Sequence, residues 1–183
     1  MTEQTSNIRI FDPQRIKFLH VVVTQGSIVT DPEFFENPVQ PVRSNIDVSA
    51  SFGFNTERKL VKVDIRSSFT GISADNQPVG ISGRYEIAFS MTVDGFDEFI
   101  VKGADGNDMF HHQIAVTMVG IAYSTARGIV VDRTLGTIMG GVFLPVLDAN
   151  ALLVPNEVAP RGPEPTSSAE EAVKKTAKSK PKK

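Results

Sequence analysis

The side chains that most often do chemistry in proteins are few in this chain, and their spacing suits it poorly. The sequence has no cysteine, which excludes disulfides, thiolate nucleophiles and cysteine-bound zinc. Its three histidines are His20, His111 and His112. The adjacent pair cannot chelate one ion from a helix, because neighbouring helical side chains point about 100° apart. We therefore expect no metal site, and we interpret Asp105 and Asp108 as part of a solvated helix start.

The sequence also lacks the motifs for phosphate binding and for nucleophilic catalysis. Residues 136–141 read GTIMGG, without the Lys-Ser or Lys-Thr pair of a P-loop, and no G-x-S-x-G elbow occurs. Asp97 and Glu98 lie near a predicted turn, where a solvated surface explains paired carboxylates. Arg127 and Asp132 lie in an apolar segment, so we expect each to need an ion pair between elements or subunits. The sequence predicts neither an enzyme nor a cofactor.

The elements that position these residues begin with four segments in which apolar and polar residues alternate. A period of two places the apolar side chains on one face of a strand. The first segment, from Ile8 to Val23, is irregular, and we expect a strand bent near Pro13. The inward positions of the other three are Ile46, Val48, Ala50, Phe52 and Phe54, then Val61, Val63, Ile65 and Phe69, then Tyr85, Ile87, Phe89, Met91 and Val93.

The stretches between these segments differ in length. Residues 55–58 are short and polar and predict a hairpin, and residues 73–83 predict the next turn. The link at residues 25–43 is long and contains Pro32, Pro38 and Pro41. Because proline disrupts regular structure, we expect neither strand nor helix there. A link of this length predicts a functional loop or a crossing connection.

After residue 106 the apolar period changes to that of a helix, which we place at about residues 109–135 with Asn107 or Asp108 as the N-cap. The helix is apolar nearly all round, so it must be buried on more than one side, whereas four strands cover only one. The sequence thus predicts an oligomer joined through this helix. A short helix capped by Asp148 follows at residues 148–154. The residues expected at the oligomer interface are Val116, Val119, Gly120, Tyr123 and Arg127.

These elements predict one α+β domain over residues 1–154: a four-stranded antiparallel sheet packed on a long helix and a short C-terminal helix. Residues 155–183 hold seven basic and four acidic residues, a net charge of +3, which leaves −5 for the rest of the chain. This segment predicts a disordered Lys/Pro-rich basic tail that meets phosphate, anionic lipid or an acidic protein face, contacts its own acidic body, or only aids solubility. With no signal region and no run of about 18 apolar residues, we expect a cytoplasmic protein without membrane insertion.

This order of elements resembles the SecB-like family of bacterial protein-export chaperones. Residues 125–154, TARGIVVDRTLGTIMGGVFLPVLDANALLV, resemble the family's helix end, apolar linker and second helix, at Ala126-Arg127, Pro145-Val146 and residues 148–153. Residues 54–65, FNTERKLVKVDI, are similar to the family's second turn. The basic tail differs from the family's polar or acidic one.

The resemblance implies a homotetramer, built as a dimer of dimers, that binds unfolded polypeptides or preproteins without ATP. It implies a role in protein export and translocation, with the export motor SecA as a partner, or the role of a toxin-linked paralogue. An acidic outer sheet would supply the docking face for a basic partner. The apolar residues exceed what a small sheet can hide, and the surplus would form a groove for unfolded clients. The residues expected to bind clients are Phe34, Phe35, Phe52, Phe54, Phe143, Leu144 and Leu147.

Two other classes of function stay open. A structural assembly subunit would bind one defined partner, and its basic tail would contact an acidic protein or nucleic acid, although we do not expect nucleic acid to be the main partner. A carrier of a small ligand would need an internal cavity and a monomer, which the two-sided helix argues against. The apolar residues assigned to the groove are also what a plain core would contain.

Overall fold

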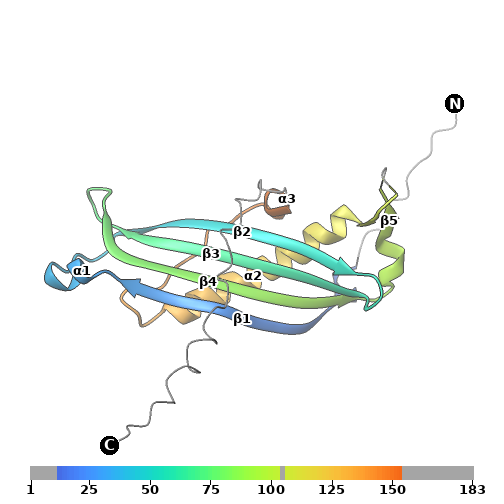
Figure 1. Cartoon of the computed structure of the whole chain (residues 1–183), viewed down its shortest axis with the longest axis horizontal. Helices are drawn as coiled ribbons and strands as arrows, with labels where there is room; N and C mark the ends of the chain where they lie inside the picture. The colour runs from blue at the N-terminus through green and yellow to red at the C-terminus, as the bar shows by residue number, and fades with distance from the viewer. Residues whose placement is uncertain (1–11, 104–105, 154–183) are drawn as a thin grey trace, which may run out of the picture.

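A four-stranded antiparallel sheet forms the body of the molecule. The computed structural model describes residues 12–103 and 106–153 (Figure 1). The strands are β1 (Ile16–Thr30), β2 (Arg43–Asn55), β3 (Leu60–Ile72) and β4 (Pro78–Val93), and their order across the sheet is β1-β4-β3-β2. β1 and β2 are therefore the two edges. The link between them crosses from one edge to the other, as its length predicts.

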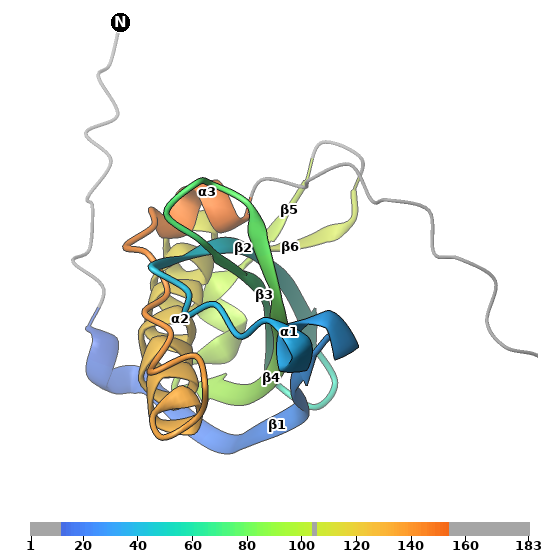
Figure 2. The ribbon, with the colours of Figure 1, turned by 90° about the vertical axis from the view of Figure 1, so that its left-hand side faces the viewer.

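The helices lie on one face of this sheet. The long helix α2 (His112–Thr134) runs along the sheet, and the short helix α3 (Ala149–Leu153) lies beside it. Figure 2 shows these helices on one side of the sheet, and no helix among residues 12–103 and 106–153 covers the other side. The predicted α+β fold, with its sheet, long helix and short helix, is confirmed. The predicted tail, residues 155–183, lies outside the described residues.

The two hairpins arise from local turn chemistry. In the first, the Asn55 side chain accepts from the Arg58 N–H at 2.7 Å, and Lys59 takes a φ of 51°. The second turn occupies only residues 73–77, because β4 already begins at Pro78. Asn76 there takes a φ of 63°, a left-handed conformation that asparagine tolerates better than most residues.

The core lies between the sheet and α2. The predicted inward residues of β3 and β4 are all buried, which confirms the period-two pattern. Those of β2 are half-buried, because β2 is an edge strand. At the centre of β4, a Cβ on Gly83 would overlap the ring of Phe69, so glycine lets this ring lie flat against the neighbouring strand.

The segment after β1 corrects one expectation. A helical turn, α1 (Pro32–Glu36), forms in the link where prolines predicted no helix. Pro32 lies in its first turn, where the missing N–H costs no hydrogen bond. β1 itself has register irregularities near Leu19 and Thr24, and the turn η1 (Pro13–Arg15) precedes it where a bend near Pro13 was expected.

The start of α2 also differs from the prediction. Residues 108–110 form β6 (Asp108–Phe110), which pairs with β5 (Ile100–Lys102), and the residue that precedes the helix is His111. The short turn η2 (Phe96–Phe99) comes just before β5. This hairpin buries Phe110 among phenylalanine rings, which a helix beginning at residue 109 would not do. The rings within 6.4 Å of Phe110 are those of Phe52, Phe54, Phe96 and Phe99.

Candidate functional site

α2 is covered on two sides by its own chain. One side packs on the sheet, and residues 135–148, here called the linker, run back along another side of the helix toward α3 (Figure 2). Val142 and Leu144 of the linker are each 1% exposed and belong to the core that the helix shares. The linker therefore covers a helix face that we expected a second subunit to bury.

Thr134, at the end of α2, anchors the beginning of the linker. It is fully buried, and its hydroxyl accepts from the Val142 N–H at 2.6 Å and donates to the Val130 carbonyl at 2.8 Å. A buried N–H without an acceptor would be costly, since the group loses its water and gains nothing. Thr134 thus fixes the point at which the chain turns back along the helix.

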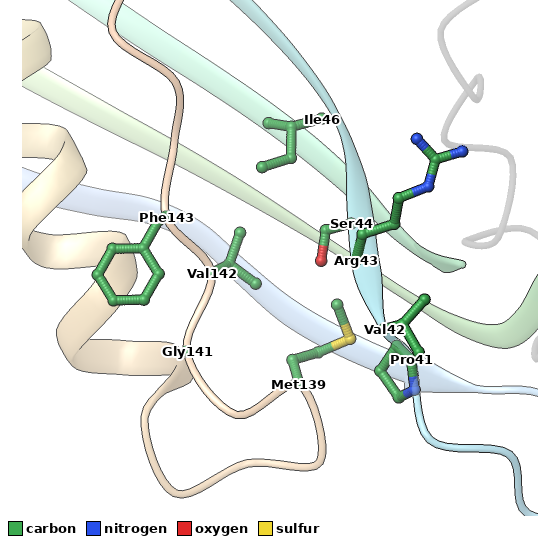
Figure 3. Close-up of a pocket in the computed structure, with 9 residues that line it drawn as sticks. All are labelled: Pro41, Val42, Arg43, Ser44, Ile46, Met139, Gly141, Val142 and Phe143. Atoms are coloured by element: carbon green, nitrogen blue, oxygen red, sulfur yellow. The ribbon is translucent and has the colours of Figure 1, made fainter. Parts of the chain in front are cut away.

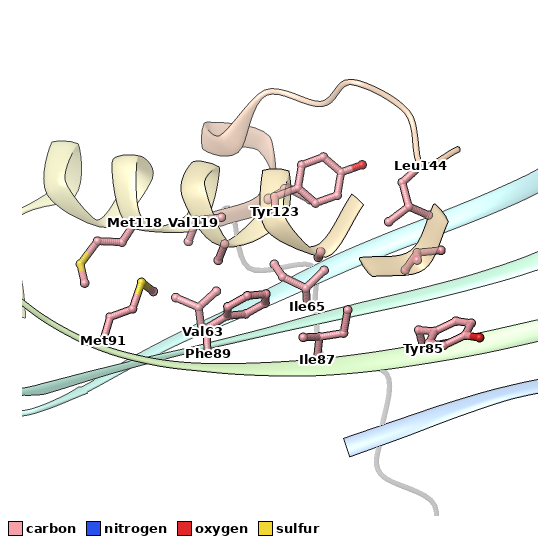
Figure 4. Close-up of a cluster of buried hydrophobic side chains, with 14 of the residues drawn as sticks. Val63, Ile65, Tyr85, Ile87, Phe89, Met91, Met118, Val119, Tyr123 and Leu144 are labelled. Carbon is pink, nitrogen blue, oxygen red and sulfur yellow. The ribbon is translucent and has the colours of Figure 1, made fainter. Parts of the chain in front are cut away.

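Tyr123 and Arg127, one helical turn apart, hold the second half of the linker. The Tyr123 hydroxyl donates to the Pro145 carbonyl at 2.6 Å, and Arg127 Nε donates to the Leu144 carbonyl at 3.0 Å. Figure 4 shows the Tyr123 ring extending from the helix and Leu144 pointing toward the sheet. These bonds stabilise the position of an extended segment that has no strand partner among the described residues.

The surroundings of Tyr123 change its acidity. Burial raises the pKa of this phenol above its ordinary value of 10.0, and the positive charge of Arg127 partly opposes that shift. The phenol therefore stays protonated, and able to donate to Pro145, throughout the physiological pH range.

Two expectations about α2 need correction. Among the described residues, neither Arg127 nor Asp132 forms an ion pair with another element: the Arg127 guanidinium donates to the Leu144 carbonyl, and Asp132 is exposed, while an ion pair between subunits stays a prediction. Val119 and Tyr123, which we expected at an oligomer interface, are 0% and 4% exposed and belong to the chain's own core. Of the other expected interface residues, Val116, Gly120 and Arg127 are partly exposed.

The outward side of the linker is apolar. The linker begins with turns at residues 135–139 and has no regular structure over residues 140–148, where Phe143 points away from the core between the buried Val142 and Leu144. Five large apolar side chains between residues 135 and 147 are 39% to 82% exposed: Leu135, Ile138, Phe143, Val146 and Leu147.

A groove separates the linker from the free edge of β2 (Figure 3). Its hollow measures about 270 Å³. Within the described chain β2 pairs only with β3, so it presents an edge with unpaired backbone groups toward this side. The residues that line the groove are Pro41, Val42, Arg43, Ser44 and Ile46 on the β2 side and Met139, Gly141, Val142 and Phe143 on the linker side.

Phe143 is the one expected client-binding residue in this groove. It is 70% exposed, and Phe35 and Leu147 are also exposed, at 74% and 39%, but lie outside the groove lining. Two groove residues were not predicted from the sequence: Val42, 66% exposed, and Met139, 8% exposed, which faces it across the groove (Figure 3). Val42 lies next to Pro41 in the proline-rich link, so an apolar residue beside a proline was the available signal.

The other four expected client-binding residues lie in the fold's interior or at its margin. Phe34 and Leu144 are 7% and 1% exposed, because the first points from α1 into the core and the second points into the core from the linker. Phe52 and Phe54 are half-buried and contact Phe110 at ring-centroid distances of 5.6 Å each. The structure therefore does not gather the seven residues into one surface.

β1 is an apolar edge strand of 15 residues. Its register with β4 places Phe18, Val21 and Val23 on the helix side and Val22 and Val29 on the outer side. Long apolar edges are the features through which sheets pair with another chain. The large apolar residues of β1 that are 37% to 55% exposed are Phe18, Leu19, Val21, Val22, Val23 and Val29.

The uncovered face of the sheet is not acidic, contrary to expectation. Its charged residues largely neutralise one another: Glu86 contacts Arg84 and also lies 3.8 Å from Arg66, and Asp64 contacts Lys62 at 3.0 Å. The alternation of β2, β3 and β4 places these charges on the face opposite the core. We expected the carboxylates of this face to bind a basic partner, but basic side chains of the same face already lie beside them.

α2 is long and apolar enough, by length and composition, to cross a membrane, with a mean hydropathy of 1.6. In this structure it is the core helix, and its buried residues pack on the sheet and under the linker. The expectation of no membrane insertion stays a prediction.

Comparisons with known proteins find structural likenesses only. No family model and no curated protein matches the sequence. A SecB-like chaperone of Mycobacterium tuberculosis, solved with a peptide from the HigA1 antitoxin, is similar over 73% of this chain and 91% of its own, with 12% identity and a TM-score of 0.49. A protein of unknown function from Streptococcus agalactiae is similar over 72% of this chain and 97% of its own, with 12% identity and a TM-score of 0.40.

Proposed function

We propose that this protein is a non-enzymatic, ATP-independent chaperone that holds unfolded polypeptides in extended form. The observation that carries the proposal is the groove, where exposed apolar side chains lie beside an unpaired strand edge. The resemblance of residues 125–154 to the SecB-like family leads to the same hypothesis.

The chemistry of the groove suits many different clients. Phe143 and Val42 offer exposed apolar contact without a defined shape, and Met139 in the groove lining, only 8% exposed, has a flexible side chain that adapts to different partners. The edge of β2 offers hydrogen bonds to the backbone of an extended client, which every sequence possesses. An unfolded chain has both features exposed, whereas a folded protein hides them.

The proposal includes a homo-oligomer, for which the apolar edge of β1 is the best candidate interface. A protein exposing six large apolar residues on one edge would aggregate unless a partner covered them. The tetramer that the sequence resemblance implies, and a cytoplasmic location, belong to the same proposal. The balanced charges of the outer sheet argue against SecA docking there, so we leave export coupling out of it.

The alternative function is a structural assembly subunit with one permanent partner. The β1 edge favours this candidate too, since a permanent partner could cover it. Substitutions in the groove distinguish the two functions. They should weaken the binding of unfolded polypeptides to a chaperone, whereas an assembly subunit would not bind unfolded polypeptides through the groove at all.

Phe143→Asp tests the groove directly. Binding of a reduced, permanently unfolded polypeptide, measured by fluorescence anisotropy, should weaken at least about tenfold, because the bound client would cover a charge in place of the Phe143 ring. The side chain is 70% exposed, so the fold should survive the change. Val101→Asp is the matched control: Val101 is 42% exposed and lies on the β5–β6 hairpin, outside the groove lining. Equal client binding by the two variants would rule out the groove.

A further inference from the structure

One end of the sheet carries carboxylates that form no ion pair with another described residue. Asp31, Glu33 and Glu36 flank or lie in α1, and Asp75 lies in the β3–β4 turn at the same end of the sheet (Figure 1). All four are exposed, and no ion pair joins any of them to another described residue. Arg43, the nearby cation, donates instead to the Asn76 side chain at 2.8 Å.

The opposite end of the sheet is arranged differently, although it also carries a group of carboxylates. There Asp94, Asp97 and Glu98 each contact a base, at 2.7 Å from Lys17, 2.5 Å from Lys59 and 3.0 Å from Arg15. The unpaired charge at the α1 end is therefore a local property of that end and does not follow from the chain's acidic composition alone.

Apolar side chains accompany the unpaired carboxylates. Phe35 is 74% exposed between Glu33 and Glu36, and Val39, in the link that follows, is 47% exposed. The position of α1 is fixed, because the Asp31 N–H donates to the Gly80 carbonyl at 2.7 Å and Phe34 is buried beneath it. We name the surface made by the four carboxylates, Phe35 and Val39 the α1 surface. It suits a partner with closely spaced positive charges, since an aromatic face also attracts cations.

The chain itself contains a segment with that chemistry. Its last ten residues, KKTAKSKPKK, hold six lysines and no acidic residue. The 21 residues from 154 to 174 can span about 70 Å when extended. The sheet is shorter, because the 16 residues of β4 rise about 54 Å. The lysines can therefore reach the α1 surface of the same copy, at the roughly millimolar effective concentration of a tethered segment.

We propose that residues 174–183 dock on the α1 surface of their own chain. The lysines would neutralise the four carboxylates, with aliphatic stems lying along Phe35 and Val39. Because the pairs are solvent-exposed, docking should weaken as salt rises. The inference concerns a surface outside the groove and does not depend on client binding.

Photo-crosslinking of the full chain tests this contact. We would place p-benzoylphenylalanine at position 179, in place of Ser179, and map its crosslinks by mass spectrometry at low salt. We expect crosslinks concentrated in residues 31–39 and 74–77, within one copy, as judged by the single-chain band on a denaturing gel. About 0.5 M salt should reduce them several-fold.

Two charge variants decide the result. The set Asp31→Asn, Glu33→Gln, Glu36→Gln and Asp75→Asn should reduce these crosslinks at least about fivefold. The matched set Asp94→Asn, Asp97→Asn and Glu98→Gln removes similar charge from the paired end and should leave them unchanged. Crosslinks that favour the paired end, that join different copies, or that keep the same distribution in both variants would overturn the proposal.

Discussion

At the scale of single residues, the linker depends on three side chains of α2. Thr134, Arg127 and Tyr123 donate to or accept from the linker backbone, and each contact joins residues 8 to 22 positions apart in the sequence. Because these bonds determine which linker side chains face the core, they also determine that Phe143 faces the groove.

Tyr123→Phe should make the protein less stable by about 1 kcal/mol at neutral pH, since the bond to Pro145 is lost. Burial raises the phenol's pKa in the folded state, so the unfolded chain releases this proton at lower pH than the folded chain does. The contribution of Tyr123 is thus complete below about pH 10 and is lost as pH rises through the folded-state pKa. Urea unfolding at neutral pH and at about pH 11 should show that the variant loses less of its free energy of unfolding at the alkaline pH than the wild type does. An identical alkaline loss in both proteins would contradict this role.

Thr134→Val should lower the free energy of unfolding more than Tyr123→Phe does, by about 1–3 kcal/mol. The buried Val142 N–H loses its acceptor, while the volume of the side chain stays the same. Thr134→Ser keeps the hydroxyl and is the control. The urea midpoints of the two variants give the comparison. A valine variant as stable as the serine variant would show that the bond does not anchor the linker.

At the scale of elements, the long strands of the sheet could be predicted from the sequence, whereas the short elements α1 and β6 could not. The inward residues of β3 and β4 followed from period two alone, because strongly buried strands show that pattern most clearly. α1 and β6 were missed. A one-turn helix starting at Pro32 leaves almost no pattern in the sequence, and β6 depends on the contact of Phe110 with rings from distant strands.

Contacts between distant segments, which leave little pattern in the sequence, also explain why only some site residues were predicted. Phe143 was found because apolar residues were in surplus around the linker, but exposure distinguishes it from Leu144, its buried neighbour. Sequence composition cannot separate two adjacent residues of an extended segment that face opposite ways. Val42 and Met139 join the groove only because the fold brings the crossing link against the linker.

The edge strand β1 gives a prediction for assembly. Leu19→Lys with Val22→Lys adds positive charge to an exposed apolar edge, and the two residues are 49% and 51% exposed. The free energy of unfolding of a single chain should change by about 0.5 kcal/mol or less, whereas charges on the edge should block pairing between copies. Sedimentation velocity should show a smaller assembly than the wild type.

Val101→Lys is the control for this pair, since it adds a charge at a residue of similar exposure on the β5–β6 hairpin. It should leave the assembly unchanged. A wild-type sedimentation coefficient for the β1 variant would place the interface elsewhere, with the outward side of the linker as the next candidate.

At the scale of the whole molecule, three surfaces have different chemistry. The groove combines the exposed apolar side chains of Phe143 and Val42 with polar groups of the β2 edge, the β1 edge is apolar on both faces, and the outer sheet is polar with largely neutralised charge. This separation allows one edge of the sheet to serve assembly while the other serves clients. The sequence predicted the surplus of apolar residues but not this separation, because it arises from the order of strands across the sheet.

The most direct test of the account is native mass spectrometry of the purified full chain, alone and with one equivalent of an unfolded polypeptide. The folded form of the same polypeptide is the control. We expect a homo-oligomer that binds the unfolded form and leaves the folded form free, without added nucleotide. A monomer, or an oligomer that ignores the unfolded polypeptide, would contradict the proposed chaperone function.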